Sequence, residues 1–228
     1  MSDKPVVVAT LLTGKCPERI KMAKIAVECF FAQDYSHREL LIVNHGEESL
    51  GFPDAREYMV TRDVYRTLGD LRNYAMECAQ PNLVVTWDDD DWYAPNYISE
   101  MVDRWKPGHL VNYKFQTRHD VQSNSSYVCG LNGGHHGQVL YDSRCGYRYQ
   151  QLNVAEDTKF MWCFGKSRIT FDNDALFYCR LAHPWNTWGR KHIMKGHEKS
   201  KNYHHKMGAK QKEFIAKIRK VYGLPAKV

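Results

Sequence analysis

Short apolar runs alternate with segments of helical periodicity over residues 5–105, and this alternation restricts the possible folds most strongly. The apolar runs, each of strand length and rich in aliphatic residues, are 5–10, 39–43 and 83–87. Apolar residues recur at helical spacing in 17–32, 68–79 and 95–105. Because strand–helix–strand repetition favours parallel pairing, we expect an α/β fold whose mixed, mostly parallel sheet is flanked by helices on both faces.

The remaining elements are less regular, and the pattern predicts them individually. Further strands are expected at 59–64, 110–117, 137–141 and 175–181, and further helices at 156–164 and 209–222. In sheets of this kind, ligands bind beyond the carboxyl ends of the strands. Polar residues that directly follow the apolar runs are therefore the first candidates for a functional site.

The composition is that of a packed protein. Hydrophobic residues make up 43% and charged residues 25% of the 228 residues, which argues against a disordered chain. No apolar run is long enough to span a bilayer and the N-terminus shows no signal-peptide pattern, so we expect a cytoplasmic protein. The seven cysteines are scattered without a CxxC pair, and we interpret them as reduced thiols that mostly fill the core.

Positive charge is concentrated at the C-terminal end of the chain. Residues 189–228 contain twelve Lys or Arg and two acids, whereas the preceding 188 residues carry a net charge of −4. One interpretation is a solvated, lysine-rich helix. The other is a surface that binds an anionic partner, such as nucleic acid or the head groups of a membrane. The sequence leaves both interpretations open, and it does not indicate an oligomeric state.

Four consecutive aspartates, Asp88 to Asp91, directly follow the apolar run 83–87. Like charges about 4 Å apart repel by about 1 kcal/mol even in bulk water, and the apolar flanks keep this run at the end of a strand. A divalent cation such as Mn²⁺ or Mg²⁺ would neutralise the run, because it prefers carboxylate oxygens and often binds substrate phosphates as well. The alternative is that Asp91 caps the helix at 95–105, which explains one aspartate.

The order and spacing of several motifs resemble the family-2 glycosyltransferases of the GT-A fold. The matching residues are Gln33, Tyr35, the strand 39–43, Arg72, Asn73, Asp88, Asp90, Asp91 and Pro95. The resemblance covers residues 5–105. It implies a Rossmann-like GT-A architecture and transfer of a sugar from a nucleotide-sugar donor. It also identifies Asp88 and Asp90 with the two acids of the family's Asp-x-Asp motif.

The resemblance implies roles for individual residues around the donor. Asp90 is the expected direct metal ligand, and the residues expected to bind the donor are Thr10, Leu12, His45, Arg72, Asp88 and Asp89. In the family, an acid after the second strand reads the nucleobase, whereas this chain has His45 at that position. An imidazole can donate or accept a hydrogen bond, so a base contact of altered form is expected there, with a plain loop histidine as the alternative.

The second half of the chain holds a candidate base and a second candidate metal ligand. Asp157 matches the family's catalytic base, which takes the proton of the acceptor hydroxyl, and Glu156 is expected to bind the acceptor. The alternative for this acidic pair is stabilisation of a helix N-terminus. The stretch 180–188 resembles the family's Arg-x-x-His-x-x-Asn-Thr-Trp element. That match makes His183 a candidate metal ligand and Trp185 a candidate acceptor contact, unless the tryptophan is a core or lid aromatic.

Together these assignments predict a metal-dependent, inverting hexosyl- or pentosyltransferase. We expect a domain over residues 1–188, with a nucleotide-sugar half at 1–105 and an acceptor and catalytic half at 106–188, followed by a basic extension at 189–228. The expected acceptor is a modified base in viral DNA or a cell-surface glycan intermediate. The alternatives are a sugar-nucleotide nucleotidyltransferase and a non-catalytic protein that binds nucleotides or nucleic acid.

Overall fold

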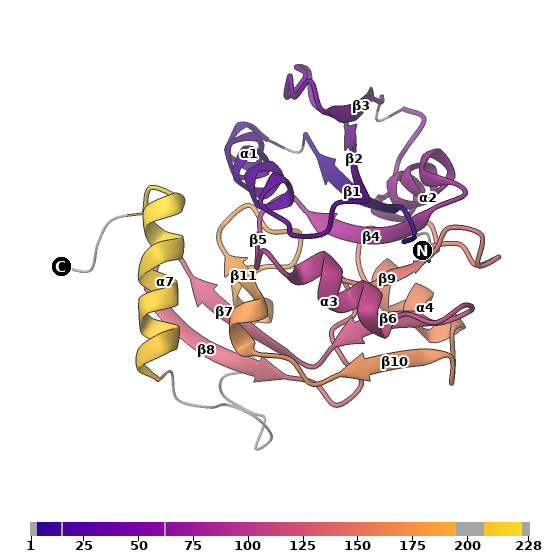
Figure 1. Cartoon of the computed structure of the whole chain (residues 1–228). Helices are drawn as coiled ribbons and strands as arrows, with labels where there is room; N and C mark the ends of the chain where they lie inside the picture. Colours follow the sequence, from indigo (N-terminus) through magenta and orange to yellow (C-terminus); the bar gives the residue numbers. More distant parts are fainter. Residues whose placement is uncertain (1–3, 15, 62, 195–207, 225–228) are drawn as a thin grey trace.

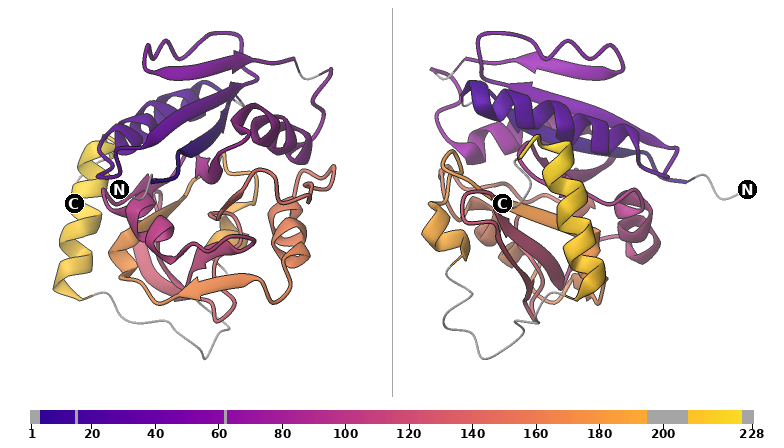
Figure 2. Two further views of the ribbon diagram at one scale, coloured as in Figure 1. Left: turned by 45° about the vertical axis from the view of Figure 1, so that its right-hand side comes forward. Right: turned by 90° about the vertical axis from the view of Figure 1, so that its left-hand side faces the viewer.

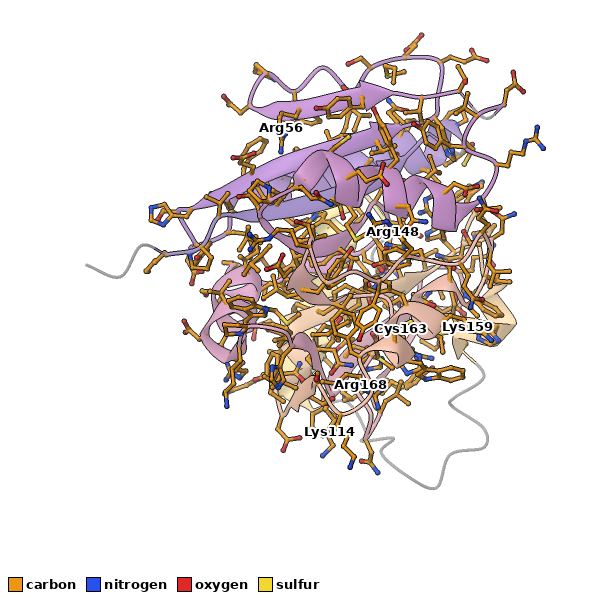
Figure 3. The ribbon with its side chains drawn as sticks, turned by 90° about the vertical axis from the view of Figure 1, so that its right-hand side faces the viewer. Arg56, Lys114, Arg148, Lys159, Cys163 and Arg168 are labelled. Carbon is orange, nitrogen blue, oxygen red and sulfur yellow. The ribbon has the colours of Figure 1, made fainter. Side chains whose placement is uncertain are left out.

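A computed structural model describes residues 4–14, 16–61, 63–194 and 208–224, and its centre is a seven-stranded sheet (Figure 1). The strands are β1 (Val7–Thr13), β2 (Arg38–Asn44), β3 (Ala55–Met59), β4 (Leu83–Asp88), β6 (Leu110–Tyr113), β9 (Leu140–Asp142) and β10 (Arg168–Phe171). Their order is β10-β6-β9-β4-β1-β2-β3, and Figure 3 marks the two end strands by Arg168 and Arg56. Neighbouring strands are parallel except at β9, which runs antiparallel to β4 and β6. The predicted mixed, mostly parallel sheet is confirmed.

The apolar strands form this sheet because successive side chains enter two different hydrophobic layers. On β1, Val7 packs into one layer and Val8 into the other. The first layer is closed by α1 (Pro17–Phe31) and α3 (Tyr97–Arg104), and the second by α2 (Leu68–Ala79) and α4 (Glu156–Cys163). Helices therefore cover both faces, as the sequence predicts.

A second, four-stranded sheet is not predicted by the sequence. It contains β5 (Trp92–Tyr93), β7 (Phe115–Asp120), β8 (Ser125–Gly130) and β11 (Tyr178–Ala182), in the order β5-β11-β7-β8. The single strand predicted at 110–117 is wrong, because the chain divides at Lys114 into β6 of the large sheet and β7 of the small one. The strand predicted at 175–181 begins with a 3-10 turn capped by Asp174, so β11 starts only at Tyr178.

Two other predicted elements begin elsewhere. The strand predicted at 59–64 lies earlier, as β3, because Ala55–Met59 pair in parallel register with Leu40–Asn44 of β2. The helix predicted at 95–105 is shorter in the structure, where α3 begins at Tyr97 with Asn96 in the N-cap position. This shift matters for the acidic run, which ends five residues before that cap.

The C-terminal helix α7 (Ala209–Val221) lies along the side of the molecule formed by α1 and the small sheet (Figure 2). Its apolar face joins the first hydrophobic layer, where Phe214 packs edge-to-face on Trp92 of β5. The helix predicted at 209–222 is thus confirmed. Before it, the basic segment contains the short helix α5 (Arg190–Met194), whereas 195–207 and 225–228 lie outside the described residues. None of the described helices is long and apolar enough to cross a membrane.

Candidate active site

The acidic run 88–91 connects the two sheets. β4 of the large sheet ends at Asp88, and β5 of the small sheet begins at Trp92. The carboxyl ends of β1 and β4 meet here because the two strands pair in parallel, and this is the edge at which α/β sheets bind ligands. A cavity opens at this edge, and its lining includes Leu12, Arg19, Arg72, Asp88, Asp89, Asp90, Gly137, Gln138, Glu156, Asp157, Arg180 and Trp188.

The start of α2 is fixed by its sequence, and this places Arg72 at the cavity. Thr67 and Asp70 form a capping box, in which each side chain accepts a hydrogen bond from the other residue's backbone N–H. Gly69 lies so close to the chain at Gln150 that a Cβ atom would stand 1.8 Å from its carbonyl oxygen. Any larger residue would push the helix away from this loop, and Arg72 with it.

Arg72 binds two acids from distant parts of the chain. Its Nε donates to Glu156 Oε1 at 3.1 Å and its Nη2 to Asp88 Oδ1 at 3.4 Å. Gln138 Nε2 donates to the other Asp88 oxygen at 2.5 Å. Burial alone would lower the pKa of Arg72, but the charges of Glu156 and Asp88 raise it above its usual value, so the guanidinium stays charged. The network joins α2, β4 and α4 at one wall of the cavity.

Arg19, in the first turn of α1, binds the next two acids of the run. Its Nη1 donates to Asp90 Oδ2 at 2.5 Å and its Nη2 donates to Asp89 Oδ1. The side chains are 12% exposed for Arg19, 1% for Asp89 and 8% for Asp90, so three charged groups lie together out of water. Burial raises the pKa of Asp89 to about 6 although the charge of Arg19 opposes it.

Asp90 Oδ2 is surrounded by three donors. Besides Arg19, His183 Nε2 lies 3.0 Å away and Asn186 Nδ2 lies 2.8 Å away. The Trp185 backbone N–H donates to His183 Nδ1, so the ring proton lies on Nε2 and points at Asp90. Burial alone would raise the pKa of Asp90, but Arg19 and His183 hold it well below its usual range. The structure therefore brings together both residues predicted as metal ligands.

Asp91 does not cap a helix, and this interpretation of the sequence is wrong. Its Oδ1 accepts a hydrogen bond from the Leu181 backbone N–H at 2.9 Å, and its Oδ2 accepts one from the Tyr178 hydroxyl. Burial, together with the charges of the neighbouring aspartates, raises the pKa of Asp91 well above its usual value. The side chain ties the acidic run to β11 of the small sheet, which explains why it turns away from α3.

Asp157, the predicted base, lies in the first turn of α4 and lines the cavity together with Asp88. Its Oδ1 accepts a hydrogen bond from the Thr158 backbone N–H at 2.6 Å. Its Oδ2 faces Gly137, where an added Cβ atom would lie 3.3 Å from Asp157 Oδ2 and 3.9 Å from Asp88 Oδ2. Two carboxylates from distant parts of the chain thus approach one point, and the glycine leaves space between them.

The predicted donor contacts on β1 and β2 are not all gathered at this cavity. Leu12 lines it, whereas Thr10 lies deeper in β1 and directs its hydroxyl to the Val85 carbonyl at 3.5 Å. Thr10 therefore packs within the sheet, and on this strand the cavity lining begins two residues later, at Leu12. His45, at the end of β2, lines a separate hollow together with Gly14.

The predicted acceptor contacts also differ in position. Glu156 lines the cavity but is 3% exposed and held by Arg72. Trp185 is 39% exposed and packs on the His183 ring, with the ring centroids 5.6 Å apart. The tryptophan that lines the cavity is Trp188. Both tryptophans lie in the 180–188 stretch, and its spacing alone does not distinguish them.

The residue types around Asp90 suit a divalent metal, although a guanidinium supplies the positive charge in this arrangement. Carboxylates and a neutral imidazole are ligands that Mn²⁺ accepts, and Asp89 Oδ2 is buried without a hydrogen-bond partner. Within the described ranges, no group of three or more His, Cys, Asp or Glu is arranged to hold a metal ion. Asp90 and His183, with the unpartnered oxygen of Asp89, are the groups that would hold one.

Comparison with known proteins agrees with the geometry. The model of the family described as glycosyl transferase family 2 matches residues 18–177, which is more than half of the chain. The chain belongs to this family. It is 30% identical over 94 residues to the uncharacterized glycosyltransferase YkcC of Bacillus subtilis. That match covers 38% of this chain and 29% of YkcC, so the matched segment spans less than a third of the length of that protein.

Two solved structures with a similar fold contain a nucleotide sugar. Staphylococcus aureus TarS 1–349 in complex with UDP-GlcNAc has a TM-score of 0.62 and 12% identity, covering 80% of this chain and 60% of that chain. The mannosyltransferase PcManGT from Pyrobaculum calidifontis, in complex with GDP-Man and Mn²⁺, has a TM-score of 0.60 and 13% identity, covering 82% and 59%. At such identities the likeness shows the fold, which is the expected GT-A architecture.

Two cavity arginines received no role from the family resemblance. Arg180 opens the 180–188 stretch on β11, lines the cavity, and has no carboxylate within ion-pair distance among the described residues. Arg19 follows Pro17 in the first turn of α1, at the sheet edge where the acidic run lies. The positive end of the helix dipole disfavours a cation in the first helical turn. This unfavourable position is the sequence signal that indicates a special role for Arg19.

Proposed function

We propose that this chain is an inverting glycosyltransferase that moves a hexosyl or pentosyl unit from a nucleotide-sugar donor to an acceptor hydroxyl, and that it depends on Mn²⁺ or Mg²⁺. The observation that carries this proposal is the approach of Asp88 and Asp157 to one point beside Gly137. The family and the nucleotide sugars bound in TarS and PcManGT support the donor class. The Mn²⁺ in PcManGT supports the metal.

In this proposal Asp157 acts as the general base. In a single displacement, the acceptor oxygen bonds to the anomeric carbon while the bond to the nucleoside diphosphate breaks on the opposite side, which inverts the configuration. The acceptor hydroxyl gives its proton to Asp157 Oδ2, since the hydrogen bonds to this side chain from Thr158 go to Oδ1. A positioned base of this kind contributes about 10²- to 10⁴-fold to the rate.

The leaving diphosphate needs positive charge near the donor wall. Arg180 can supply it, because it lines the cavity and its pKa is raised by the charges of Asp91 and the other acids, which outweigh the effect of burial. Arg72 holds Asp88 in place from the other side. A metal held by Asp90 and His183 would neutralise the developing charge on the diphosphate.

The remaining donor and acceptor assignments are proposals of the same kind. We assign the nucleotide-sugar half to residues 1–105 and the acceptor half to 106–188, with Leu12 and Asp89 on the donor side. Glu156 acts by holding Arg72. The acceptor is a cell-surface glycan intermediate or a modified base in DNA. An anionic acceptor or surface is supported by the exposed lysines of the 189–228 extension on α7, which are Lys210, Lys212, Lys217 and Lys220.

The decisive experiment is a donor screen followed by removal of the base. The protein is incubated with UDP- and GDP-sugars, Mn²⁺ and candidate acceptors, and released nucleoside diphosphate and glycosylated product are identified by mass spectrometry. Asp157→Asn should lower transfer about 10³-fold while leaving donor binding, measured by calorimetry, unchanged. Asp103→Asn, an equal change on the exposed side of α3, is the control that should transfer normally. Transfer by Asp157→Asn at the unaltered rate would remove Asp157 from the mechanism.

A further inference from the structure

The cation that pairs with Asp89 and Asp90 in this structure is a side chain of the protein itself. Arg19 places Nη1 on Asp90 and Nη2 on Asp89, so one guanidinium bridges two consecutive carboxylates. Two neighbouring buried carboxylates without a cation would be strongly unfavourable, and an unpaired charge of this kind is rarely tolerated in a protein interior. The single positive charge of Arg19 therefore compensates one of the two negative charges of Asp89 and Asp90.

This ion-pair cluster is incompletely satisfied. Asp89 Oδ2 and Arg19 Nε are both buried without a hydrogen bond of normal geometry, although the Thr13 hydroxyl lies near the Asp89 carboxylate and helps to lower its pKa. On the Asp90 side the opposite holds, because Arg19, His183 and Asn186 converge on the single oxygen Oδ2. A guanidinium has its donors in one plane and cannot reach the second Asp89 oxygen while it bridges the two residues. A spherical divalent ion has no such restriction.

The position of Arg19 on α1 also makes its contact with the two acids less favourable. The residue lies in the first helical turn, where the N-terminal end of the helix dipole disfavours a positive charge. The residue also lines the cavity, so the guanidinium can leave the acids and still face the space where a diphosphate would bind. Both features favour replacement of the Arg19 guanidinium by another cation at Asp89 and Asp90.

We propose that Arg19 is a built-in counter-cation that a divalent ion has to displace, so that Arg19 sets the metal affinity of the Asp89–Asp90 segment. This inference rests on the metal dependence proposed above. Once displaced, the guanidinium turns towards the cavity and binds the donor diphosphate. Arg19 thus couples metal loading to donor binding: it opposes the metal when the donor is absent and stabilises the complex when the donor is present.

Direct binding of Mn²⁺ tests the proposal without reference to activity. The six-line electron paramagnetic resonance signal of free Mn²⁺ is titrated with the unaltered protein, Arg19→Met, Arg19→Lys and Arg56→Met. We expect Arg19→Met to bind Mn²⁺ about tenfold more tightly or better, because a competitor reduces apparent affinity by the fraction of sites that it occupies. Arg19→Lys keeps the charge but cannot bridge two carboxylates, and should fall between. Arg56→Met, on the exposed edge strand β3, should match the unaltered protein.

The outcomes separate this inference from the proposed function. Equal Mn²⁺ affinity in the unaltered protein and Arg19→Met overturns the role of Arg19 and leaves metal dependence intact. If Arg19→Lys binds Mn²⁺ as the unaltered protein does, positive charge alone explains the effect. The proposal that a bridging guanidinium must be displaced is then overturned. Absence of Mn²⁺ binding in every variant overturns the inference and the metal dependence together. Circular dichroism verifies that each variant is folded.

A measurement on the unaltered protein keeps the proposal testable if Arg19→Met does not fold. Phenylglyoxal modifies exposed arginines, and peptide mass spectrometry gives the rate at Arg19 separately from the other arginines. Saturating Mn²⁺ should accelerate modification of Arg19, because the guanidinium leaves its buried partners, and a nucleotide-sugar donor should then protect it. An unchanged rate at Arg19 under conditions where Mn²⁺ is bound would overturn the displacement.

Discussion

The large and small sheets both bury polar side chains, but they accommodate them in different ways. At the edge of the large sheet, Arg72 pairs with Glu156 and Asp88, so that opposite charges compensate one another. In the small sheet, His119 is fully buried between Ser126 of β8, 2.7 Å from Nδ1, and Arg219 of α7, 3.0 Å from Nε2. Because an arginine can only donate, Nε2 must accept, and the buried ring is neutral.

This difference assigns distinct tasks to the two sheets. The ion pairs of the large sheet join α2, β4 and α4, which carry the acids that surround the cavity. The hydrogen bonds of the neutral His119 ring fix α7 against β7 and β8. The first arrangement holds as long as its carboxylates are ionised, whereas the second fails when one imidazole takes up a proton. The two regions should therefore respond differently to mutation and to pH.

The largest effect is expected from breaking the ion pairs of the large sheet. Arg72→Met should lower the free energy of unfolding by about 4 kcal/mol, because the loss of one partner leaves buried acids uncompensated. Urea unfolding monitored by circular dichroism measures the change. Arg56→Met, which removes an arginine from the exposed pair with Glu39, is the matched control and should change stability by less than about 1 kcal/mol. Similar losses in both variants would show that the Arg72 network is not a structural centre.

The next effect is a pH dependence that originates in the small sheet. Burial and the charge of Arg219 lower the pKa of His119 from 6.5 to about 4, although Asp120 opposes this shift. Between these pH values His119 binds a proton in the unfolded chain but not in the native state. The contribution of the neutral His119 to the free energy of unfolding is therefore complete above pH 6.5 and is lost as the pH falls to about 4. It amounts to about 3 kcal/mol.

Unfolding experiments at several pH values isolate this contribution when His119→Gln is compared with the unaltered protein. Glutamine can still donate to Ser126 or accept from Arg219, but it does not titrate. The unaltered protein should lose stability more steeply than the variant between pH 6.5 and 4, and hydrogen exchange in α7 should increase first. Parallel curves would mean that His119 is not the group that makes the small sheet acid-sensitive.

The contrast between the sheets also explains which parts of the fold the sequence predicts. The main strands of the large sheet are apolar runs separated by segments of helical periodicity. Asp88 lies at the sheet edge because the apolar run ends just before it, and β4 ends at this residue. Strand β7 instead reads FQTRHD, and its buried side chains include Gln116, Thr117 and His119. Thr117 donates to the Ala175 carbonyl, and His119 bonds to Ser126 of β8 and Arg219 of α7; no periodicity in the sequence reveals such partners.

In the candidate site, too, some residues are predictable from local sequence and others are not. Family motifs indicate Asp88, Asp90, Asp157 and His183 because these residues lie in recognisable segments. Arg19 lies 70 residues before Asp89 in a helix whose pattern specifies only a buried face, so nothing local predicts that they meet. The local sequence relates Asp91 only to the helix that follows it, because the β11 groups that bind it lie about 90 residues away. Contacts of this range depend on the junction of the two sheets.

The smallest effect is expected at that junction, where Asp91 links the acidic run to the small sheet. Burial and the charges of the neighbouring aspartates raise the pKa of Asp91 well above its usual value, so its charged form is disfavoured in the native state, unlike that of the acids paired with Arg72. Asp91→Asn should then change the free energy of unfolding at pH 7 by less than about 1 kcal/mol, since the amide can accept from the Leu181 N–H and donate to the Tyr178 hydroxyl. Asp91→Ala leaves both partners unsatisfied and should lose about 2 kcal/mol. If Asn is as destabilising as Ala, Asp91 is ionised, and the junction belongs with the charge-compensated large sheet instead.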